Sequence, residues 1–323
     1  MPLVSIISVN YNQLELTLEM LESVESNSFK NLEVIVVDNG SVIDPSEAIH
    51  KNFPKTKMVR SEKNLGFAGG NNLGIEQSSG DYLFFLNNDA VLTDGVIERL
   101  LLNFKMIPKL GIISPKICHW KNSEKDADII QYCGATRVSA FTGRNKTLGE
   151  GAVDFGQFDG VHETAYVHGA AMMTSRKVIE KVGMMPEDFF LYYEELDWCE
   201  QIKKAGFKIG LEPAAKIYHK ESVSIGKESP LKTFYLNRNR ILFMRRNFGF
   251  QTLSIFAVYL LLIGIPKNVV AHLWSGNFSN LKAYLRAVGW HLKRPFLNTK
   301  KQPAKPRLLT KNEPAMELAD SNF

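Results

Sequence analysis

The chain has 323 residues, of which 45% are hydrophobic and 23% are charged, and its formal net charge is +5. This composition excludes collagen, a coiled coil and wholesale disorder, and the length allows one large domain or two modest ones. The three cysteines, Cys118, Cys133 and Cys199, are scattered without Cys-x-x-Cys spacing. They therefore predict neither a disulfide framework nor a zinc site, and they favour a reducing compartment such as the cytoplasm.

The first 92 residues alternate strand and helix patterns. β-Rich or apolar runs predict strands over residues 3–9, 32–38, 58–60 and 82–86. Leucines at helical spacing predict a helix over residues 14–26. Continuous apolar strands that alternate with helices are typical of an α/β fold, with a mostly parallel sheet flanked by helices.

Three of the predicted strands end in polar residues. The segments are Asn10-Tyr11-Asn12, Asp38-Asn39 and Asn87-Asn88-Asp89. In parallel sheets, ligands bind beyond the carboxyl ends of the strands, so these residues predict a functional site at that edge.

Two carboxylates at these strand ends each allow two interpretations. Asp38 can accept the imide N–H of a uracil or thymine ring, or it can form an Asx turn with the loop that follows. Asp89 can bind a hard divalent cation together with phosphate oxygens, or it can cap the helix that begins near Asp94.

The stretch from residue 64 to 74 contains four glycines within nine positions. Its spacing matches neither the dinucleotide-binding motif nor the P-loop. Glycines allow a backbone to approach a phosphate or sugar closely, and they also allow a tight packing turn before a helix.

The following region continues the alternation less regularly. The patterns predict a helix and then a strand over residues 93–115, loops or an antiparallel hairpin over the site from 118 to 165, a strand entering a helix over 169–182, and a short helix over 196–205.

An acidic run follows the aromatic segment 189–193. Glu194, Glu195 and Asp197 lie within four residues, so they raise one another's pKa, and the neighbouring aromatic rings desolvate them. A general base needs a pKa tuned in this way, whereas acidic residues at a helix N-terminus also have a purely structural role. His219 is a lone histidine, which is either structural or a metal ligand.

The order of these motifs resembles the inverting family 2 glycosyltransferases with a GT-A fold, especially bacterial rhamnosyltransferase-like members. The resemblance covers roughly residues 3–245. It is carried by Tyr11, VVDNGS (36–41), NLGFAGGNNLG (64–74), FLNNDA (85–90), HGAAMM (168–173), FFLYYEELDWCEQIKKAG (189–206), IYHKES (217–222) and LNRNRILF (236–243).

The resemblance implies a role for each matching residue. Tyr11 would stack on the nucleotide base, and Asp38 would bind its imide group. The implied donor-binding residues are Asn10, Tyr11, Asp38, Asn39, Asn64, Gly70, Asn72, Asn88 and Asp89. Those implied on the acceptor side are Gly169, Ala170, Tyr193 and Glu194.

The resemblance also implies a metal site and a general base. Asp89 and His219 would hold Mn²⁺ or Mg²⁺ on the donor diphosphate. The metal motif has Asn87-Asn88-Asp89 in place of Asp-x-Asp, which leaves metal dependence open. Glu195 would be the base, at a position where many members have Asp, and Asp197 is the alternative.

The implied activity is transfer of a sugar from a nucleoside diphosphate to a glycan or lipid-linked glycan in bacterial surface polysaccharide synthesis. dTDP-rhamnose is the first donor to consider. A UDP-hexose transferase (galactose, GlcNAc or glucose) and a non-catalytic sugar- or lipid-binding relative are alternatives. Nucleotidyl transfer is disfavoured, because SVNYNQLE follows the first strand where a Gly-rich loop with Arg would be expected.

The C-terminal part differs sharply in charge. Residues 216–310 carry 17 basic and two acidic residues, whereas residues 1–215 carry 21 basic and 29 acidic ones. Arg238, Arg240, Arg245 and Arg246, with later basic residues beside Trp, Tyr and Leu, predict helices at the inner face of the plasma membrane.

Other interpretations of these helices are a cap on the core or a homodimer interface. No nucleic-acid-binding module surrounds the basic segment, so we expect no nucleic-acid partner. The apolar run Leu253–Pro266 is shorter than the roughly 20 residues of a spanning helix, so a membrane-spanning segment is not expected.

These patterns predict three parts. Residues 1–235 form a GT-A catalytic domain, with a nucleotide-binding half (1–92) and an acceptor half (93–235). Residues 236–299 form a basic amphipathic helical extension. Residues 300–323 form a polar tail that we expect to be disordered.

Overall fold

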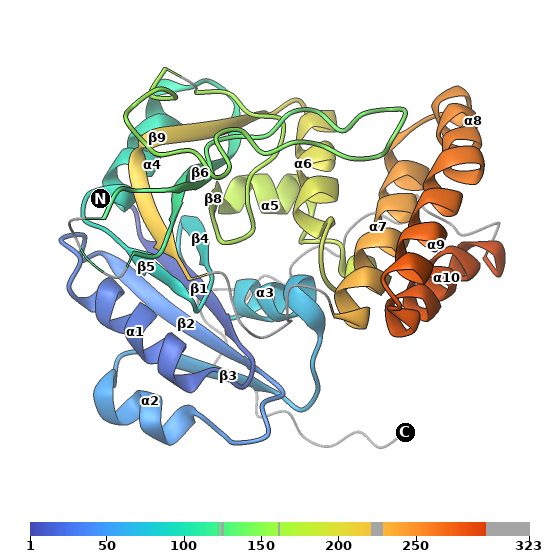
Figure 1. Cartoon of the computed structure of the whole chain (residues 1–323). Helices are drawn as coiled ribbons and strands as arrows, with labels where there is room; N and C mark the ends of the chain where they lie inside the picture. Colours follow the sequence, from blue (N-terminus) through green and yellow to red (C-terminus); the bar gives the residue numbers. More distant parts are fainter. Residues whose placement is uncertain (122, 124–125, 161, 221–228, 295–323) are drawn as a thin grey trace.

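The computed structural model describes residues 1–121, 123, 126–160, 162–220 and 229–294 of the chain. The predicted disordered tail, residues 300–323, lies outside the described residues. The predicted α/β class is confirmed: a nine-stranded sheet has the order β3-β2-β1-β4-β8-β6-β9-β5, with β7 added beside β6, and helices flank the sheet (Figure 1).

The N-terminal half of the sheet is parallel. Its strands are β1 (Val4–Asn10), β2 (Leu32–Asn39), β3 (Lys57–Ser61) and β4 (Tyr82–Leu86). The helices between them are α1 (Leu14–Glu25), α2 (Ser46–Asn52) and α3 (Gly66–Glu76). The chain moves from β1 through β2 to β3 and then returns to the other side of β1 with β4. Ligand sites of open α/β sheets form at such a reversal of strand order.

The second half of the sheet mixes parallel and antiparallel pairs. Its strands are β5 (Ala90–Leu92), β6 (Leu110–His119), β7 (Ile130–Tyr132), β8 (Ala171–Ser175) and β9 (Lys208–His219). β8 is antiparallel to β4 and β6, whereas β6 and β9 are parallel. The helical elements are α4 (Val96–Met106), α5 (Arg176–Val182), the 3₁₀ turn η1 (Glu187–Phe189) and α6 (Glu194–Lys204).

The Gly-rich stretch is a helix, not the loop expected over residues 64–74. α3 begins at Gly66, and the sequence obscured it because glycine is a poor helix former. A Cβ at Gly70 would lie 2.8 Å from Cγ1 of Val9, and one at Gly74 would overlap Cγ2 of Ile7. These two glycines therefore serve close packing of α3 on β1.

Five helical segments follow the sheet and form the right-hand side of Figure 1. They are α7 (Pro230–Asn247), α8 (Phe250–Tyr259), the π-helical turn η3 (Leu260–Gly264), α9 (Ile265–Trp274) and α10 (Phe278–Leu292). α7 runs through the boundary predicted at residue 235.

The expectation that no segment is long enough to span a membrane is wrong. The helix Phe250–Trp274 has 25 residues, and its most apolar window of 18 residues has a mean hydropathy of 1.9, so it could cross a membrane by length and composition. The helix does not end at Pro266: the π-helical turn η3 lies just before this proline, and α9 continues past it. A π-turn is one way in which a helix accommodates an interruption of its regular hydrogen bonds.

The arginines of α7 were expected at a membrane interface, and for three of them the structure corrects this. Arg238 and Arg240 are 8% and 3% exposed, and the Arg246 side chain is 5% exposed. α7 packs against α6 and α10 rather than facing outward. Apolar neighbours, which favoured a membrane in the sequence, instead mark a helix inside the protein.

The packing of α3 yields the first prediction. We expect Gly74→Ala to lower the free energy of unfolding by about 1–3 kcal/mol, because its methyl group would displace Ile7 in the core. Chemical denaturation measures this change. Gly289→Ala in α10 is the matched control: no atom lies within 4 Å of its added methyl group, so this variant should unfold at the same or a higher denaturant concentration. Equal destabilisation of the two variants would contradict the packing role.

Candidate active site

The carboxyl ends of β1, β2 and β3 place three functional groups side by side. The parallel register pairs Asn10 with Asp38, and Asp38 with Arg60. Asn10 Nδ2 donates to Asp38 Oδ1 at 3.0 Å, and Arg60 Nε lies 3.3 Å from Asp38 Oδ2. Asp38 is fully buried, and Oδ2 has no hydrogen-bond partner among the described residues. This oxygen is therefore a ready acceptor for an N–H group of a ligand.

The residues around Asp38 fix its orientation. Asn10 also donates to Ser41 Oγ at 3.2 Å and accepts from Thr17 Oγ1 at 3.0 Å. Arg60 NH2 donates to the Ser41 carbonyl, and its NH1 is paired with Asp44. Arg60 was not among the predicted site residues. Its only signal was its place at the end of a short predicted strand.

Tyr11, Asn39 and Asn64 lie next to this cluster. Tyr11 is 42% exposed and directly follows Asn10, so its ring is free to stack on a planar ligand. Asn39 Oδ1 accepts from Leu65 N at 2.9 Å, and Asn39 Nδ2 donates to Asn64 Oδ1 at 3.2 Å. Asn39 and Asn64 therefore hold the turn that leads into α3.

Three residues expected to bind the donor have other partners. Asn72 is buried and exchanges hydrogen bonds with the backbone of Met185, and it also donates to Glu187 Oε1 at 2.8 Å. Asn88 is turned toward α1, where it donates to Gln13 and Thr17. Gly70 packs on Val9, as described above. The structure thus corrects these expectations: Asn72, Asn88 and Gly70 support the site rather than line it.

Asp89 and His219 face each other across the end of the sheet. His219 Nε2 lies 2.9 Å from Asp89 Oδ1, and both residues are buried. His219 Nδ1 lies 2.8 Å from Gln131 Oε1, which can only accept, so the network assigns a proton to Nδ1. In a neutral imidazole, Nε2 then presents a lone pair to a carboxylate oxygen, and this contact needs a proton or a metal ion between the two atoms.

The donor set fits a divalent cation that shares its coordination with a ligand. Neither carboxylate oxygen of Asp89 has a hydrogen-bond partner within the described ranges. No group of three or more His, Cys, Asp or Glu side chains that could hold a metal occurs in the described part of the chain. Asp89 and His219 would therefore supply two ligands, and oxygens of a diphosphate or water would supply the others.

His168 lies beside this pair and was missed in the list of predicted site residues. Its ring is 6.2 Å from the His219 ring, and burial lowers the pKa of His168 to about 3. Its Nδ1 accepts from Ala170 N at 3.1 Å, while the Ala170 carbonyl accepts from Asn87 N at 2.9 Å. Gly169 lies against Phe67 of α3. Gly169 and Ala170 therefore lie just before β8, close to Asp89 and His219.

The segment before α6 has an unusual backbone. Phe190, Tyr192 and Tyr193 all have positive φ, at 65°, 68° and 74°, which is uncommon for residues other than glycine. Such strain persists only where surrounding contacts impose it, and it is frequent at functional sites.

Two side chains of α7 impose this backbone. Asn239 is fully buried, and its Nδ2 lies 2.7–2.8 Å from the carbonyl oxygens of Phe189, Leu191 and Tyr192. Arg238 NH2 donates to the carbonyl of Phe189 at 2.9 Å. The motif LNRNRILF therefore holds the segment that leads to the acidic run.

Helix α3 contacts the segment before α6 from the other side. Phe67 N, in the first turn of α3, donates to the Phe190 carbonyl at 2.7 Å. Gly66 has φ of 76°, and a Cβ there would overlap the Phe190 carbonyl oxygen, so only glycine fits. The nucleotide side and the acidic run are thus joined through α3.

Glu194 and Glu195 begin α6; Glu194 is buried and Glu195 is half-buried. One oxygen of each, Oε2, has no hydrogen-bond partner among the described residues. Burial raises the pKa of Glu195 to about 7, and burial together with the neighbouring Glu195 charge raises the pKa of Glu194. A carboxylate with a pKa near neutrality suits proton transfer at physiological pH.

Asp197 has a different environment. It is 1% exposed, and its oxygens accept from Arg246 Nε at 3.1 Å, Asn247 Nδ2 at 2.6 Å and Gln201 Nε2 at 2.7 Å. This ion pair joins α6 to α7. The contacts occupy Asp197, whereas Glu194 and Glu195 each retain an oxygen without a hydrogen-bond partner among the described residues.

Glu195 lies in the wall of a cavity of about 470 Å³. The lining residues come from α6, α7, α9 and the turn around residue 144: Arg144, Asn145, Tyr192, Tyr193, Glu195, Leu196, Leu236, Asn237, Arg240 and Asn268. Tyr193, predicted on the acceptor side, donates its hydroxyl to the Gly143 carbonyl at 3.2 Å, which fixes this wall.

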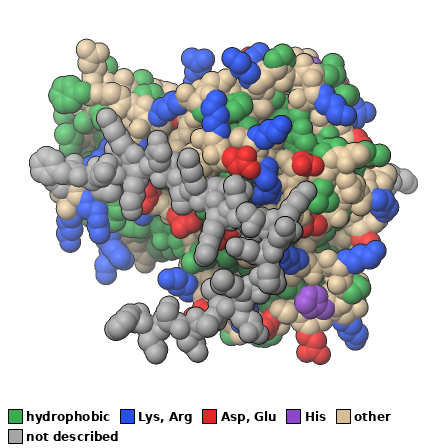
Figure 2. All heavy atoms as spheres, turned by 180° about the vertical axis from the view of Figure 1, so that it is seen from behind, with side chains coloured by type: hydrophobic (Ala, Val, Ile, Leu, Met, Phe, Trp, Pro, Cys, Tyr) green, Lys and Arg blue, Asp and Glu red, His purple; other side chains and the backbone are tan. Residues whose placement is uncertain are grey.

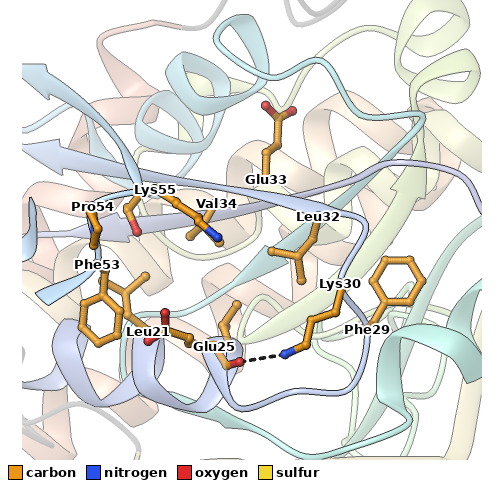
Figure 3. Close-up of a pocket in the computed structure, with 12 residues that line it drawn as sticks. Leu21, Glu25, Phe29, Lys30, Leu32, Glu33, Val34, Phe53, Pro54 and Lys55 are labelled. Carbon is orange, nitrogen blue, oxygen red and sulfur yellow. Dashed lines mark hydrogen bonds between the residues drawn. The ribbon is translucent and has the colours of Figure 1, made fainter.

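A second cavity, of about 380 Å³, lies away from these residues (Figure 3). Leu32 and Val34 at the amino end of β2 line it together with Leu21 of α1 and Phe53. Lys30 Nζ donates to the Glu25 carbonyl at its rim. It therefore opens at the opposite end of β2 from Asp38, where no site residue was predicted.

Comparison with known proteins identifies the architecture. A family model described as Glycosyl transferase family 2 matches residues 5–183, which is more than half of the chain. The low-salt glycan biosynthesis hexosyltransferase Agl10 of Haloferax volcanii is 27% identical over 248 residues, covering 74% of each protein. The poly-β-1,6-N-acetyl-D-glucosamine synthase of Staphylococcus aureus is 23% identical over 82% of this chain and 60% of its own length. An uncharacterized protein of Sinorhizobium fredii, y4gI, is 26% identical over 76% of this chain, which spans only 27% of that protein.

Solved structures share the fold. GalNAc-T7 with UDP, GalNAc and Mn²⁺ superposes with a TM-score of 0.63 at 11% identity, covering 91% of this chain and 57% of the other. The mannosyltransferase PcManGT of Pyrobaculum calidifontis, in complex with GDP-Man and Mn²⁺, gives 0.54 at 16% identity, with 91% and 81% coverage. These likenesses show that the sheet and its helices form a GT-A fold.

The buried carboxylate of Glu195 makes stability depend on pH. Its pKa is about 7 in the folded protein and near 4.5 in the unfolded chain, so between these values the folded state retains a proton that the unfolded state releases. The free energy of unfolding therefore falls as the pH rises through 7. Glu195→Gln removes this pH-dependent loss of stability. The free energy of unfolding of the variant minus that of the wild type, measured in urea titrations, should therefore increase from pH 5 to pH 8. Glu62→Gln, at an exposed position, is the control and should show no such increase. A difference independent of pH for Glu195→Gln would contradict the raised pKa.

Proposed function

Because the chain belongs to glycosyl transferase family 2, and is therefore a glycosyltransferase, we propose that it transfers a sugar from a nucleoside diphosphate to a hydroxyl of a glycan or lipid-linked glycan, with inversion. The observation that carries this proposal is Glu195: a buried carboxylate with an unpartnered oxygen in the wall of a cavity, while Asp197 beside it is fully paired.

The proposed reaction is one in-line displacement. Glu195 accepts the proton of the acceptor hydroxyl, and that oxygen forms a bond to the anomeric carbon. The bond from this carbon to the diphosphate oxygen breaks on the opposite face, so the anomeric configuration inverts. The protonated Glu195 then releases its proton to solvent, for which a pKa near 7 is favourable.

Asp38 and Tyr11 would select the nucleotide. Asp38 Oδ2, which has no hydrogen-bond partner among the described residues, would accept the imide N–H of uracil or thymine, and Tyr11 would stack on the ring. Asn10 and Arg60 would orient the carboxylate. Guanine also carries an N–H at the corresponding edge, so the donor-binding experiment below identifies the nucleobase.

Asp89 and His219 would hold Mn²⁺ or Mg²⁺ against the donor diphosphate. The ion, when bound, supplies positive charge that stabilises the leaving diphosphate. Gln131 keeps the proton on His219 Nδ1, and Nε2 is thereby left free for coordination.

We keep dTDP-rhamnose as the first donor, as the motif order implies. Two relatives are named for hexosyl and N-acetylglucosaminyl transfer, which favours a UDP-hexose as the second candidate. Both nucleotides carry the imide group that Asp38 would bind.

We also propose that the C-terminal helices lie in the surface of an anionic membrane. In the helix Phe250–Trp274, 17% of the most apolar window is buried, so most of that window faces outward. Phe256 and Leu260 pack on the body of the protein, whereas Leu261, Leu262 and Trp274 are 64%, 72% and 92% exposed. Because one side is attached to the catalytic domain, this helix would lie along the membrane instead of crossing it.

The charge around this surface favours anionic lipid. Residues 229–294 contain no Asp or Glu, and Lys267, Lys282 and Arg286 are exposed. Lys282 and Arg286 line one surface hollow together with Phe278, Leu281 and Leu285. Figure 2 shows hydrophobic side chains at the upper left edge, where the C-terminal helices lie, with Lys and Arg side chains below them. Lys and Arg near a membrane surface each favour binding by about 1 kcal/mol.

The catalytic proposal predicts the effect of Glu195→Gln. We expect this variant to release nucleoside diphosphate at a rate at least about 100-fold below the wild type, because no general base remains. Its affinity for the donor should be unchanged. The measurement is release of nucleoside diphosphate from UDP-glucose, UDP-galactose, UDP-GlcNAc, dTDP-rhamnose and GDP-mannose, with Mn²⁺ and octyl glycoside acceptors, alongside calorimetric binding of each donor.

Asp197→Asn is the contrasting variant in this experiment. This variant should have a lower melting temperature, because it weakens the buried ion pair with Arg246. Its rate of nucleoside diphosphate release should fall only in proportion to the fraction of protein that is unfolded. Wild-type rates for Glu195→Gln would exclude Glu195 as the base. Binding of none of the donors by the wild type would overturn the proposed function as a whole.

The membrane proposal predicts binding to vesicles. The full chain should co-sediment with phosphatidylcholine vesicles that contain phosphatidylglycerol and only weakly with phosphatidylcholine alone. Replacing Leu261 and Leu262 by Gln should weaken binding about tenfold or more, since their apolar area would no longer enter the membrane. The control replaces Val42 and Ile43, which are 88% and 80% exposed on the nucleotide side, and should bind like the wild type. Equal binding by both variants would contradict the proposal; a change from dimer to monomer in the first would assign the surface to a second copy.

A further inference from the structure

Three arginines of α7 are buried, and one of them differs from the others. Arg246 is paired with Asp197 and Asp188, and Arg238 donates to backbone carbonyls. Arg240 is 3% exposed, and neither a hydrogen bond nor an ion pair of its side chain occurs within the described ranges. A buried guanidinium without a partner is costly, because its lost hydration is not replaced.

The surroundings of Arg240 add no negative charge at bonding distance. Burial, followed by the nearby charge of Arg144, lowers the pKa of Arg240. Arg144 is itself exposed, and its side chain forms no ion pair with another described residue. Two guanidinium groups therefore share one region, and neither forms an ion pair with a described carboxylate, although Glu195 lines the same cavity.

A tight turn brings Arg144 close to Arg240 and to the cavity. The turn at 139–144 is closed by backbone hydrogen bonds between Ser139 and both Gly143 and Arg144. Gly143 has φ of 65°, and a Cβ there would lie 3.2 Å from Cγ of Arg240 and 3.0 Å from the Phe256 ring. Glycine at 143 thus lets the turn rest on α7 and α8, with Arg144 at the rim.

Both arginines line the cavity that contains Glu195. The cavity has a volume of about 470 Å³, which is within the range of small-molecule sites. Asn10, Asp38, Asp89 and His219 do not line it, so it lies apart from the donor residues. If Glu195 is the general base, the molecule that binds beside it in this cavity is the sugar acceptor.

We propose that Arg240, assisted by Arg144, binds an oxyanion of the acceptor, a phosphate or a carboxylate close to the hydroxyl that reacts at Glu195. This inference rests on the proposed function and extends it by naming the acceptor as anionic. The guanidinium fork matches the oxygen geometry of both groups, and charge-assisted hydrogen bonds inside a cavity are strong. The oxyanion supplies the partner that Arg240 lacks.

The test compares acceptors that differ in charge, two of which carry the same sugar. The panel consists of octyl N-acetylglucosaminide (neutral), an alkyl diphosphate-linked GlcNAc (phosphate) and an octyl glucuronide (carboxylate). The full chain is assayed with each, using the donor that binds in the preceding experiment. We expect the wild type to use one anionic acceptor with a kcat/KM at least about tenfold above the neutral one. The better anion distinguishes a lipid-linked diphosphate from an acidic sugar.

Arg240→Gln and Arg240→Met should remove this preference. The donor Kd should stay at the wild-type value, and the ratio of kcat/KM for the anionic acceptor to kcat/KM for the neutral acceptor should fall about tenfold or more. Arg99→Gln, at an exposed position on α4, is the matched control and should keep the preference. Equal use of neutral and anionic acceptors by the wild type, or an equal loss for both in the Arg240 variants, would overturn the proposal.

A second measurement does not depend on the choice of acceptor. Arg240→Met should be at least as stable as the wild type in urea, because it removes an unpartnered buried charge. Inorganic phosphate should raise the melting temperature of the wild type more than that of Arg240→Met. A destabilised Arg240→Met with an unchanged response to phosphate would show that Arg240 is structural and that the inference is wrong. If no donor binds and no acceptor reacts while this phosphate difference persists, the oxyanion site stands and the proposed function fails.

Discussion

The position of Glu195 depends on a helix that comes about forty residues later in the chain. Asn239 donates to three carbonyl groups of the segment before α6, those of Phe189, Leu191 and Tyr192, and three non-glycine residues of that segment have positive φ. Without these contacts the backbone would relax to a more favourable conformation, and α6 would no longer begin with its two carboxylates buried. The ion pair between Arg246 and Asp197 adds a second connection between α7 and α6. The catalytic domain and the C-terminal helices are therefore interdependent at the site.

Several buried polar atoms of the site have no hydrogen-bond partner among the described residues. These are Asp38 Oδ2, both oxygens of Asp89, one oxygen each of Glu194 and Glu195, and Arg240 Nε. Two of them have an ion-pair contact only: Asp38 Oδ2 with Arg60 Nε at 3.3 Å and Asp89 Oδ1 with His219 Nε2 at 2.9 Å. Each lowers the stability of the free protein, since hydration is lost and not replaced. Such atoms mark where a ligand supplies the missing partner. The charge of each side chain fits the ligand group proposed for it. The carboxylates of Asp38 and Asp89 would bind an N–H group and a cation, whereas the guanidinium of Arg240 would bind an anion.

The sequence predicted the fold correctly, because the fold follows from local patterns, whereas the chemistry assigned to the strand ends stays a prediction. Apolar runs ending in Asn10, Asp38 and Asp89 indicated parallel strands and a shared edge. The sequence could not predict the roles of Asn72 and Asn88, which depend on partners far away in the chain or on the direction in which a side chain turns. It also placed α3 in a loop, because the glycines that let it pack on Val9 and Ile7 are the same residues that weaken a helix pattern.

The basic charge of the C-terminal part illustrates why composition alone misassigns a surface. Arg238, Arg240 and Arg246 are buried and hold or complete the site, while Lys267, Lys282 and Arg286 face outward beside exposed leucines. All six contribute equally to the net charge of this part, yet only the outer three can contact lipid. The same helices therefore serve two purposes: their inner arginines organise the segment carrying the proposed base and the cavity beside it, and their outer face would bring that cavity to a membrane. An acceptor that is presented at a membrane surface and has an anionic group near its reactive hydroxyl would fit both features: its anionic group would bind Arg240 inside the cavity, and the membrane would contact the outer face of the helices.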